Sequence, residues 1–570
     1  MSAIQKRWKF KTFDLSIARE LCEQLRIHPV LCNILSLRGI KTFEEAKHFF
    51  RPSINDLHDP FLMKDMHVAV KRIIKAIKDN EKILIYGDYD VDGTTSVSSL
   101  FDFLKFIYPS NLIEYYIPDR YKEGYGLSSA GITYAHENQF SLLITLDCGI
   151  KSIDLIAEAK EKLIDTIVCD HHLPGNTLPP AFAILNPKQP SCNYPYKELC
   201  GCGVGLKLIQ ALCHELNLDS THYIKYLDLV ATAIAADIVP ITGENRVLAF
   251  HGLLKANENP NTGIKALLDQ SKLKGNLSIQ SLSFVIGPRI NAAGRMGDAK
   301  RAVALFIEKD IEHAREIALT LQSENTNRKE ADSSITEEAL LQISQEANIH
   351  HKKTIVVYND HWHKGVLGIV ASRLLEKFYR PTIVLTKSGD FYTGSARSIA
   401  GFNIYEGLDK CSHLLHAFGG HYFAAGMTIA PDQIELFKST FESIANATLE
   451  AEDMIPEIEI DAEIKIKDIN QAFYNIMQQM EPFGPENNRP VFCIRNVKNI
   501  GCRIVKDEHL RFEVAQEGMI ITGIGFNLAQ KYEQLNRPDL MDIVFSIEEN
   551  IFNGRTSLQM KVIDFNHPIN

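Results

Sequence analysis

Three acidic residues alternate in a short segment that follows an apolar run. The segment Asp88-Tyr89-Asp90-Val91-Asp92-Gly93 comes directly after Ile83-Leu84-Ile85-Tyr86. Carboxylates this close repel one another unless water solvates them or a cation lies between them. Taken alone, the segment is more typical of a solvated surface turn than of a binding site.

Two further apolar segments end in metal-ligand residue types. The run 141–146 leads into Asp147-Cys148-Gly149, and the run 166–169 leads into Asp170-His171-His172. In an open parallel sheet, ligands bind beyond the carboxyl ends of the strands, where residues far apart in sequence converge. Oxygen ligands mixed with imidazole favour manganese over magnesium or calcium. The recurrence therefore predicts a divalent metal site.

The acids are suited to holding two ions. Two divalent ions roughly 3.5–4 Å apart can activate a water and stabilise the charge that develops on a phosphoryl group. Such a pair needs a bridging carboxylate. We expect Asp90 and Asp92 to bind different ions and Asp147 to bridge them.

The remaining candidates are two histidines and one aspartate. His171 would add a nitrogen ligand. Neighbouring side chains on an extended segment point to opposite faces, so His172 is expected at the phosphate or the leaving group instead. Asp237 ends the alanine-rich segment 231–236 and would supply another oxygen, although by itself it is typical of an ordinary helix end.

Arginines with small neighbours form the candidate anion sites. Arg289 and Arg295 lie in Gly287-Pro288-Arg289-Ile290-Asn291-Ala292-Ala293-Gly294-Arg295, and Arg397 ends Gly394-Ser395-Ala396-Arg397. The small residues let a chain backbone approach closely, and Arg120 provides another guanidinium. Each arginine alone is more typical of a surface ion pair.

The elements that would position these residues follow from hydrophobic periodicity. Strand-like and helical segments alternate from Lys82 to about Cys169, which predicts a doubly wound α/β domain, and a second α/β pattern begins at Thr354. Ile311, Ala314, Ala318 and Leu321 have helical spacing in a bridging segment. The last hundred or so residues alternate at period two, as in a small β-barrel.

The composition narrows the classes of protein. At 570 residues, 45% hydrophobic and with a net charge of −10, the chain is multidomain and is not a broadly basic nucleic-acid coat. Its 11 cysteines and the absence of an amino-terminal signal peptide predict a cytoplasmic protein, and no apolar run is long enough to span a membrane. Cys192, Cys200, Cys202 and Cys213 are too irregularly spaced for a typical zinc site, so we expect reduced thiols.

Eight ordered motifs resemble those of the DHH phosphoesterase superfamily and, within it, the bacterial RecJ family of single-strand-specific exonucleases. They are GDYDVDGTTS at 87–96, IPDRYKEGYGLS at 117–128, TLDCGI at 145–150, CDHHLP at 169–174, ADIVP at 236–240, PRINAAGR at 288–295, WHKGVLGIVASRL at 362–374 and FGGHYFAAG at 418–426. The resemblance covers almost the whole chain.

The resemblance implies a site for two Mn²⁺ or Mg²⁺ ions. Asp88 would support the metal ligands from behind, and His172 would assist catalysis at the scissile phosphate. The implied ligands are Asp90, Asp92, Asp147, His171 and Asp237. Relatives often carry a histidine ligand where this chain has Tyr86. They usually carry Leu-Ala-Gly where this chain has Leu199-Cys200-Gly201, and we expect a packing change there without a new metal site.

The resemblance also implies the nucleic-acid contacts. Arg120, Ser395 and Arg397 would hold the 5′-terminal phosphate. Other residues would line the path of the strand between the two α/β domains: Arg289, Asn291, Arg295, Gly419, Gly420 and His421. The β-rich end would be an oligonucleotide-binding (OB) fold, which binds single strands by stacking and backbone charge.

We therefore expect an α/β protein of five parts. These are an extension at 1–80, a DHH domain at 81–250, a helical linker at 251–350, a smaller DHH-associated domain at 351–450 and an OB domain at 455–570. The implied activity is 5′→3′ hydrolysis of single-stranded DNA to 5′-mononucleotides in repair and recombination. A monomer is expected, acting on strands with a 5′ end alongside a helicase and a single-strand-binding protein.

Two other functions remain open at this point. A phosphodiesterase for short RNA oligomers or cyclic dinucleotides would need only the two α/β domains, and the β-rich end and the amino-terminal extension argue against it. A non-catalytic nucleic-acid scaffold would have lost metal ligands, whereas all five implied ligands are present.

Overall fold

The computed structural model describes residues 6–273, 275–346, 349–552 and 554–567. They form two compact units, which we describe separately. The parallel-sheet unit comprises residues 42–326 and 479–489, and the composite unit comprises the described residues of 1–41, 327–478 and 490–570.

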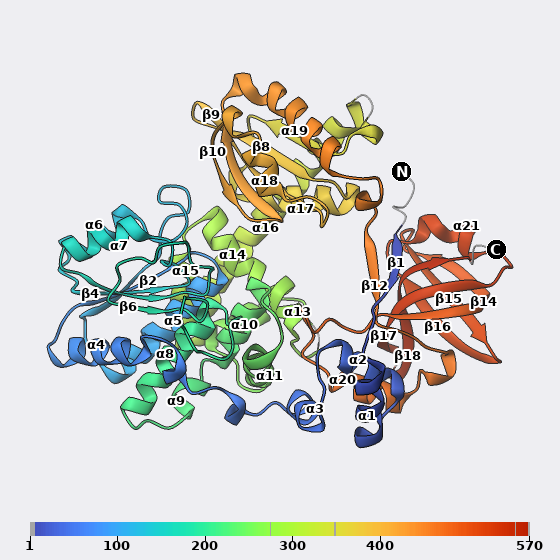
Figure 1. Ribbon diagram of the computed structural model, residues 1–570, viewed down its shortest axis with the longest axis horizontal. Helices are drawn as coiled ribbons and strands as arrows, with labels where there is room; N and C mark the ends of the chain where they lie inside the picture. The colour runs from blue at the N-terminus through green and yellow to red at the C-terminus, as the bar shows by residue number, and fades with distance from the viewer. Residues whose placement is uncertain (1–5, 274, 347–348, 553, 568–570) are drawn as a thin grey trace. The chain divides into compact units, whose positions relative to one another are not determined.

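A five-stranded, wholly parallel sheet lies at the centre of the parallel-sheet unit (Figure 1). Its order is β3-β2-β4-β5-β6, with the strands β3 (Ile113–Tyr116), β2 (Ile83–Gly87), β4 (Leu142–Leu146), β5 (Asp165–Cys169) and β6 (Ala183–Leu185). The strands are apolar because both faces of the sheet are covered by helices.

Alternation along the strands assigns side chains to the two faces. Ile83 and Ile85 pack in the larger apolar core, while Leu84 and Tyr86 pack in a smaller one on the opposite face. Helices α4 (Met66–Lys78), α5 (Val91–Ile107) and α8 (Gly201–Glu215) contribute to the larger core, and α6 (Ser129–Glu137) and α7 (Ile153–Glu161) to the smaller. This is the doubly wound arrangement predicted from the sequence.

A run of helices extends the larger core beyond the sheet. It comprises α9 (Thr221–Ile224), α10 (Leu227–Asp237), α11 (Gly243–Glu258), α12 (Thr262–Asp269), α13 (Ile279–Ser281), the π-helix η3 (Leu282–Ile286), α14 (Gly287–Met296) and α15 (Lys300–Ile307). The long α16 (Ile311–Gln345) continues from this unit into the other. The expected linker is therefore helical, and most of its helices pack on the first core.

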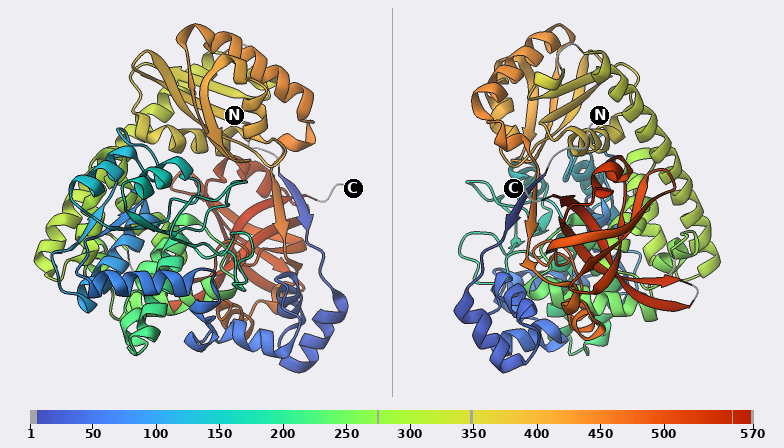
Figure 2. Two further views of the ribbon diagram at one scale, coloured as in Figure 1. Left: turned by 60° about the vertical axis from the view of Figure 1, so that its left-hand side comes forward. Right: turned by 90° about the vertical axis from the view of Figure 1, so that its right-hand side faces the viewer.

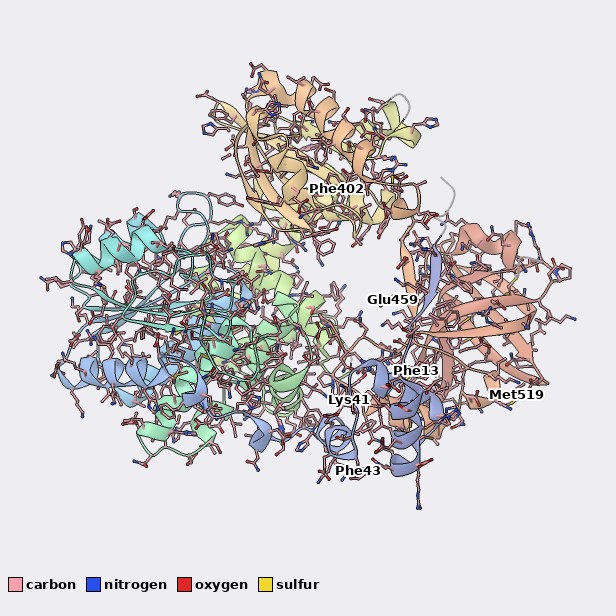
Figure 3. The ribbon with its side chains drawn as sticks, viewed as in Figure 1. Phe13, Lys41, Phe43, Phe402, Glu459 and Met519 are labelled. Carbon is pink, nitrogen blue, oxygen red and sulfur yellow. The ribbon has the colours of Figure 1, made fainter. Side chains whose placement is uncertain are left out.

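The composite unit contains a mixed five-stranded sheet of order β10-β11-β9-β8-β7. The strands are β7 (Ile355–Asn359), β8 (Thr382–Ser388), β9 (Phe391–Arg397), β10 (Leu415–Gly420) and β11 (Ala424–Ile429), and only β7 and β8 pair in parallel. Helices α17 (Leu367–Phe378), α18 (Ile404–Asp409) and α19 (Ile434–Thr448) pack with it, with Phe402 in its core (Figure 3). This is the second α/β pattern of the sequence.

A closed β-barrel follows near the carboxyl end (Figure 2). Its strands are β13 (Ala462–Glu463), β14 (Phe492–Val505), β15 (His509–Gln516), β16 (Met519–Gly525), β17 (Met541–Phe552) and β18 (Arg555–Asn566), and pairing of β14 with β17 closes it. Two short helices, α20 (Gln471–Gln478) and α21 (Tyr532–Leu535), interrupt the strands. The predicted barrel is confirmed, although its region is not entirely β.

The amino-terminal residues divide between the two units. Strand β1 (Arg7–Phe10) pairs in parallel with β12 (Glu457–Ile460), and helices α1 (Leu15–Leu25) and α2 (Pro29–Leu37) belong to the same unit, whereas α3 (Phe43–Phe50) belongs to the other. Just after β1, Lys11 pairs with Glu459 at 3.1 Å and with Asp461 at 3.3 Å. Arg7 and Lys9 of β1 also pair with Glu457, so basic residues on and after β1 face acidic residues on and after β12.

Candidate active site

The acidic turn after β2 is shaped by backbone contacts. Asp90 caps α5, and its Oδ1 accepts a hydrogen bond from the Gly93 amide at 3.0 Å. A Cβ at position 93 would lie 2.4 Å from the Asp88 carbonyl oxygen, so the turn closes only around glycine. The turn therefore presents its three acids at the carboxyl end of β2, as expected.

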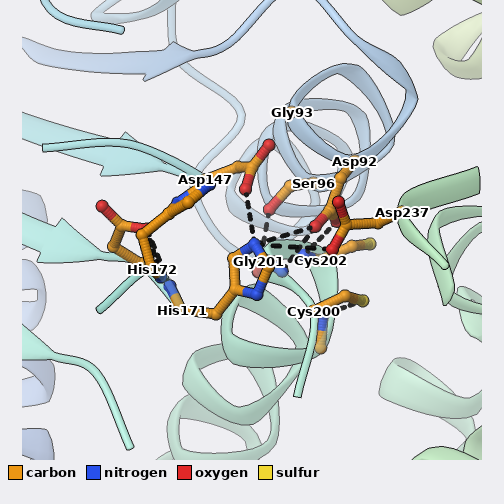
Figure 4. A network of polar contacts seen from close by, with 12 residues as sticks. Asp92, Gly93, Ser96, Asp147, His171, His172, Cys200, Gly201, Cys202 and Asp237 are labelled. Atoms are coloured by element: carbon orange, nitrogen blue, oxygen red, sulfur yellow. Dashed lines mark hydrogen bonds and ion pairs between the residues drawn. The ribbon is translucent and has the colours of Figure 1, made fainter. Parts of the chain in front are cut away.

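The other predicted ligands reach the same place from three elements (Figure 4). Asp147 follows β4, His171 follows β5, and Asp237 is the last residue of α10. His171 Nε2 lies 3.2 Å from Asp147 Oδ1, 3.6 Å from Asp237 Oδ2 and 3.8 Å from Asp92 Oδ2. Asp147 has φ of 60°, an uncommon conformation for a non-glycine residue that is often found at functional sites.

Three overlapping groups of ligand atoms result. Asp88, Asp90 and Asp147 form one, Asp92, His171 and Asp237 a second, and Asp147, His171 and His172 a third, each with its atoms within 4.8 Å of one another. Asp147 and His171 each belong to two groups. The structure therefore brings together all five implied ligands, with Asp88 beside them.

The charges in this cluster are not balanced by the protein. Burial and neighbouring acids raise the pKa of Asp147 well above its usual range, and the same causes raise the pKa values of Asp88, Asp92 and Asp237.

Several of the buried polar atoms in the cluster also lack a partner. Within the described parts of the chain, Asp88 Oδ2, Asp147 Oδ1 and His171 Nε2 have no hydrogen-bond partner. Burial, with repulsion from His172, lowers the pKa of His171 to about 3, so the ring is neutral and can donate a lone pair. Divalent cations fit such a set of oxygen and imidazole donors.

Asp92 is oriented by the amino-terminal end of α8. The amides of Gly201 and Cys202 donate to its two carboxylate oxygens, each at 2.6 Å. A Cβ on Gly201 would lie 2.6 Å from the Asp147 Cβ, so this glycine also makes room for the second acid. Cys200 caps the helix through its sulfur. The sequence indicated only a packing change here and not this contact.

Asp170 belongs to the same cluster, although the sequence pattern assigned it no role. Its Oδ1 lies 2.7 Å from His172 Nδ1, and the carboxylate accepts the backbone amides of Ile150, His171 and His172. Although burial opposes it, the bonds and charge of His172 lower the pKa of Asp170 to about 2, and Asp170 in turn raises the pKa of His172. Its position beside two candidate histidines was the available signal.

Tyr125 is a second residue of the cluster that no sequence pattern indicated. Its hydroxyl donates to the Asp147 carbonyl oxygen at 3.0 Å and lies 3.2 Å from His172 Nε2. Asp170 and Tyr125 therefore contact the two nitrogens of the His172 ring from opposite sides, which fixes its orientation.

Tyr86 does not take the place of a ligand. Its hydroxyl donates to the Gly126 carbonyl oxygen at 2.9 Å, and its ring stacks on Tyr116 with centroids 5.2 Å apart. Tyr86 packs in the smaller core, where a Cβ on Gly131 would lie 2.5 Å from its ring. Tyrosine at this position thus has a packing role.

The predicted anion-binding residues of the parallel-sheet unit lie on α14 and after β3. Arg289 donates through Nε to Gln322 Oε1 at 2.8 Å, and burial lowers its pKa. Arg120 stacks over the Tyr89 ring at 4.9 Å from its centroid. Asn291 and Arg295 are half-buried on α14, and the Arg295 carbonyl oxygen accepts the hydroxyl of Tyr121.

The predicted residues of the composite unit gather on its mixed sheet. Ser395 on β9 and Gly419 on β10 both lie opposite Gly426 of β11, the strand between them. Arg397 donates to Ser395 Oγ at 2.9 Å, and burial lowers its pKa. Gly420 and His421 continue from β10 into the turn before β11, where the His421 amide donates to the Ala424 carbonyl oxygen at 2.8 Å.

The cysteines form no metal site within the described residues. None of the groups of three or more ligand atoms found there includes a cysteine, and all 11 cysteines are free thiols. Among the described helices, none is long and apolar enough to cross a bilayer.

Three family models match successive parts of the chain. They are described as the DHH family, N-terminal domain, at residues 82–234, the DHHA1 domain at 351–447 and the RecJ OB domain at 460–564. They correspond to the parallel sheet, the mixed sheet and the barrel.

Curated relatives match over nearly the full chain. The single-stranded-DNA-specific exonuclease RecJ of Bacillus subtilis (strain 168) is 38% identical over 572 residues, covering 99% of this chain and 71% of the relative. The exonuclease of the same name from Escherichia coli (strain K12) is 32% identical over 561 residues, with coverage of 95% and 96%.

Solved structures give the same result. Crystal structures of RecJ from Thermus thermophilus in complex with Mn²⁺ and with Mg²⁺ match with TM-scores of 0.85 and 0.79 and identities of 26% and 25%. Each match covers 99% of this chain, and 80% and 79% of the respective structures.

Proposed function

The chain belongs to the RecJ family of single-stranded-DNA-specific exonucleases, and we propose that it removes 5′-mononucleotides from the 5′ end of single-stranded DNA in repair and recombination. It is a hydrolase that acts on single-stranded DNA. One observation carries the chemistry: a buried group of carboxylates and a neutral imidazole converges at one sheet edge with its charges unbalanced.

The cofactors are divalent Mn²⁺ or Mg²⁺ ions. Asp90, Asp92, Asp147, His171 and Asp237 are assigned as their ligands, and Asp88 supports them. When bound, such ions activate a water and stabilise the charge on the phosphoryl group. The amides of α8 hold Asp92 in place.

His172 is assigned to the scissile phosphate or the leaving group. Asp170 favours its protonated form, which can donate a hydrogen bond or a proton to a developing negative charge. Tyr125 fixes the ring from the other side. Asp170 and Tyr125 are therefore positioning residues for His172.

The nucleic-acid contacts are assigned residue by residue. Ser395 and Arg397 take the 5′-phosphate, because a hydroxyl and a guanidinium lie side by side on β9. Arg120 contributes a further charge to the phosphates. The path of the strand is assigned to Arg289, Asn291, Arg295, Gly419, Gly420 and His421.

The phosphate assignment is tested by replacing Arg397 with alanine. We expect Arg397→Ala to slow hydrolysis of 5′-phosphorylated strands more than that of 5′-hydroxyl strands, because the lost guanidinium recognises the phosphate. Lys387→Ala removes an exposed cation from the neighbouring strand β8 and is the matched control. Equal losses on both substrates would remove the assignment.

The polarity and the substrate are tested with labelled strands. Single-stranded DNA labelled at the 5′ end should release its label as a mononucleotide at once, whereas a 3′ label should stay on shortening strands. The phosphodiesterase alternative is not favoured, because the relatives match along nearly the whole chain, including the barrel. Faster hydrolysis of a dinucleotide than of the long strand would favour the phosphodiesterase alternative instead.

The cellular setting and the domain limits are also part of the proposal. We place the enzyme in the cytoplasm as a monomer, supplied with single strands by a helicase and a single-strand-binding protein. The proposed domains are the five expected from the sequence: 1–80, 81–250, 251–350, 351–450 and 455–570. Gel filtration of the purified chain and affinity capture with DNA present would test the monomer and the partners.

A further inference from the structure

A cavity of about 450 Å³ lies in the parallel-sheet unit and has no role in the function so far described. Its walls are formed by the end of α10, Leu253 of α11, the segment from Leu277 to Phe284, and the loop from Glu481 to Arg489. All of these parts belong to the same compact unit. The volume falls within the range of roughly 300–1,000 Å³ typical of small-ligand sites.

The cavity presents large apolar side chains to solvent. Phe284 is 73% exposed and Ile238 is 68% exposed. Phe284 lies on the π-helix η3, a rare element that is frequently found at functional sites. Exposed apolar groups that line a concavity indicate a binding surface, whereas isolated ones on a convex face are ordinary.

The backbone around these residues is specifically held. Ile238 has φ of 60°, which is uncommon for a β-branched residue. The Ser283 hydroxyl donates to the carbonyl oxygens of Ala235 at 2.5 Å and Ile279 at 3.0 Å, so it links η3 to the end of α10. The positions of Phe284 and Ile238 are therefore fixed relative to each other.

The opposite wall combines an aromatic ring with a cation. The Arg489 guanidinium lies 4.6 Å from the centroid of the Phe483 ring and pairs with Glu481 at 2.8 Å. Exposed Gln280 lies on the rim with an amide that can both donate and accept. Aromatic faces, a stacked arginine and an amide are the groups that proteins use to bind unpaired bases.

The cavity adjoins the metal centre. Ile238 lines it, and the preceding residue, Asp237, places its carboxylate 3.6 Å from His171 Nε2. Ala235 and Ala236 of the same helical turn also line the cavity. A strand whose phosphates are held beside Asp237 by the proposed ions and arginines can therefore place a neighbouring base against this wall.

We propose that this cavity is a nucleobase subsite that receives one unpaired base of the DNA strand next to the nucleotide being cut. The base stacks on Phe284 and turns its edge toward Gln280. The subsite rests on the proposed function in that it takes the same strand. Binding in this subsite requires each base to unstack from its neighbours before the adjacent phosphate is cut. A base that is paired with a second strand could not enter the cavity.

Metal-free binding tests this subsite without hydrolysis. A set of single strands carries 2-aminopurine at one position each, counted from the 5′ end, and binds the full-length protein in EDTA. Stacking on an aromatic ring quenches 2-aminopurine, so we expect strong quenching at one position with the wild type and its loss with Phe284→Ala. The affinity of this variant should fall roughly 5- to 100-fold, as expected for one lost base stack.

Two further variants keep the test decisive. Phe106→Ala removes an exposed phenylalanine at the far end of α5 and should bind and quench like the wild type. Gln280→Ala should weaken binding without abolishing quenching, which keeps the test valid if Phe284→Ala is unstable. An abasic site at the quenched position should weaken wild-type binding but add nothing to the loss in Phe284→Ala.

The outcomes separate the subsite from the activity. Quenching that is equal at all positions, or unchanged in Phe284→Ala, would overturn the subsite, including the case in which the cavity binds a protein segment instead. Hydrolysis of 5′-labelled strands in Mn²⁺ is measured separately. A wild type that quenches at one position but does not hydrolyse would retain the subsite and refute the proposed activity.

Discussion

Two buried groups of charged residues in the parallel-sheet unit differ in whether the protein itself balances their charge. In one, Lys207 Nζ contacts Glu244 Oε1 at 2.7 Å, the His58 carbonyl oxygen at 2.9 Å and Gln210 Oε1 at 3.0 Å. Glu244 also accepts the Tyr194 hydroxyl at 2.6 Å. This group, which we call the Lys207 network, is balanced by its own residues.

The metal centre is the other group, and its residues do not balance one another. Asp92, Asp147 and Asp237 surround a neutral His171, and buried oxygens of Asp88 and Asp147 lack hydrogen-bond partners among the described residues. Burying a charge costs free energy in both groups. Only in the Lys207 network do ion pairs and hydrogen bonds within the protein offset that cost. Buried charge alone therefore does not identify a functional site, whereas buried charge without a protein partner does.

The largest effect is expected from Asp147→Ala, which removes the carboxylate that belongs to two ligand groups. Hydrolysis of 5′-labelled single-stranded DNA in Mn²⁺ should fall by several orders of magnitude, because we propose this residue as the ligand that bridges both ions. DNA binding measured by fluorescence anisotropy should be largely kept, since the arginines remain. Activity close to that of the wild type would show that the bridge is wrongly assigned.

The Lys207 network should respond in the opposite way. Lys207→Met leaves Glu244 buried without its cation, which should cost about 3–5 kcal/mol of folding free energy in urea denaturation. Manganese affinity of the folded protein should not change. Pairing it with Glu244→Leu should restore much of the stability. A drop in manganese affinity as large as that of a ligand variant would break the distinction between the two groups.

A smaller effect is expected where the protein only positions a ligand. In Gly201→Ala the new Cβ would collide with Asp147, so manganese affinity measured by calorimetry should fall roughly 10- to 100-fold. Gly203→Ala is the matched control in the same helix, because its nearest contact is Leu199 at 3.4 Å. Equal affinities of the two variants would show that α8 does not position the acids.

The smallest effect is a dependence of stability on pH. Burial and neighbouring charges raise the pKa of Asp92 to about 7 and that of Asp237 to about 8 in the metal-free protein. These acids hold protons more tightly when folded than when unfolded. Their contribution to stability is therefore greatest at low pH and is lost as the pH rises through those values.

Bound cations favour the charged forms, so the gain in melting temperature on adding Mn²⁺ should increase as the pH rises toward 8. The free energy of stabilisation by Mn²⁺ should increase by at most about 1.4 kcal/mol per pH unit for each carboxylate. Asp92→Asn should flatten this dependence, and Lys207→Met should not. A gain that shrinks with rising pH would contradict the sign.

The convergence of the proposed metal ligands could be predicted from the sequence because a parallel sheet has a simple rule. Strands that end in acids or histidines at the same edge bring those residues together, and Asp90, Asp147 and His171 obey it. Asp170 was not predicted, because the side of the chain to which an acid points depends on the backbone beyond the strand. The contact of Tyr125 with His172 spans 47 residues and has no local pattern.

The types of the elements could be predicted from the sequence, but the pairing of distant segments could not. Period-two and helical spacing report which face of an element is buried, so the two α/β patterns and the barrel could be identified. The same patterns say nothing about pairing between distant segments. Nothing in the sequence therefore indicated that residues 6–41 belong with the barrel, or that the loop 481–489 packs with α10.

The pairing of β1 with β12 has a consequence for how the chain is made. Arg7 and its partner Glu457 lie 450 residues apart, so a ribosome that adds roughly 5–20 residues per second needs about 20–90 s to supply the partner. During that time the first strand has no neighbour. A tag or fusion before it should therefore alter the yield of soluble protein more than one at the other end.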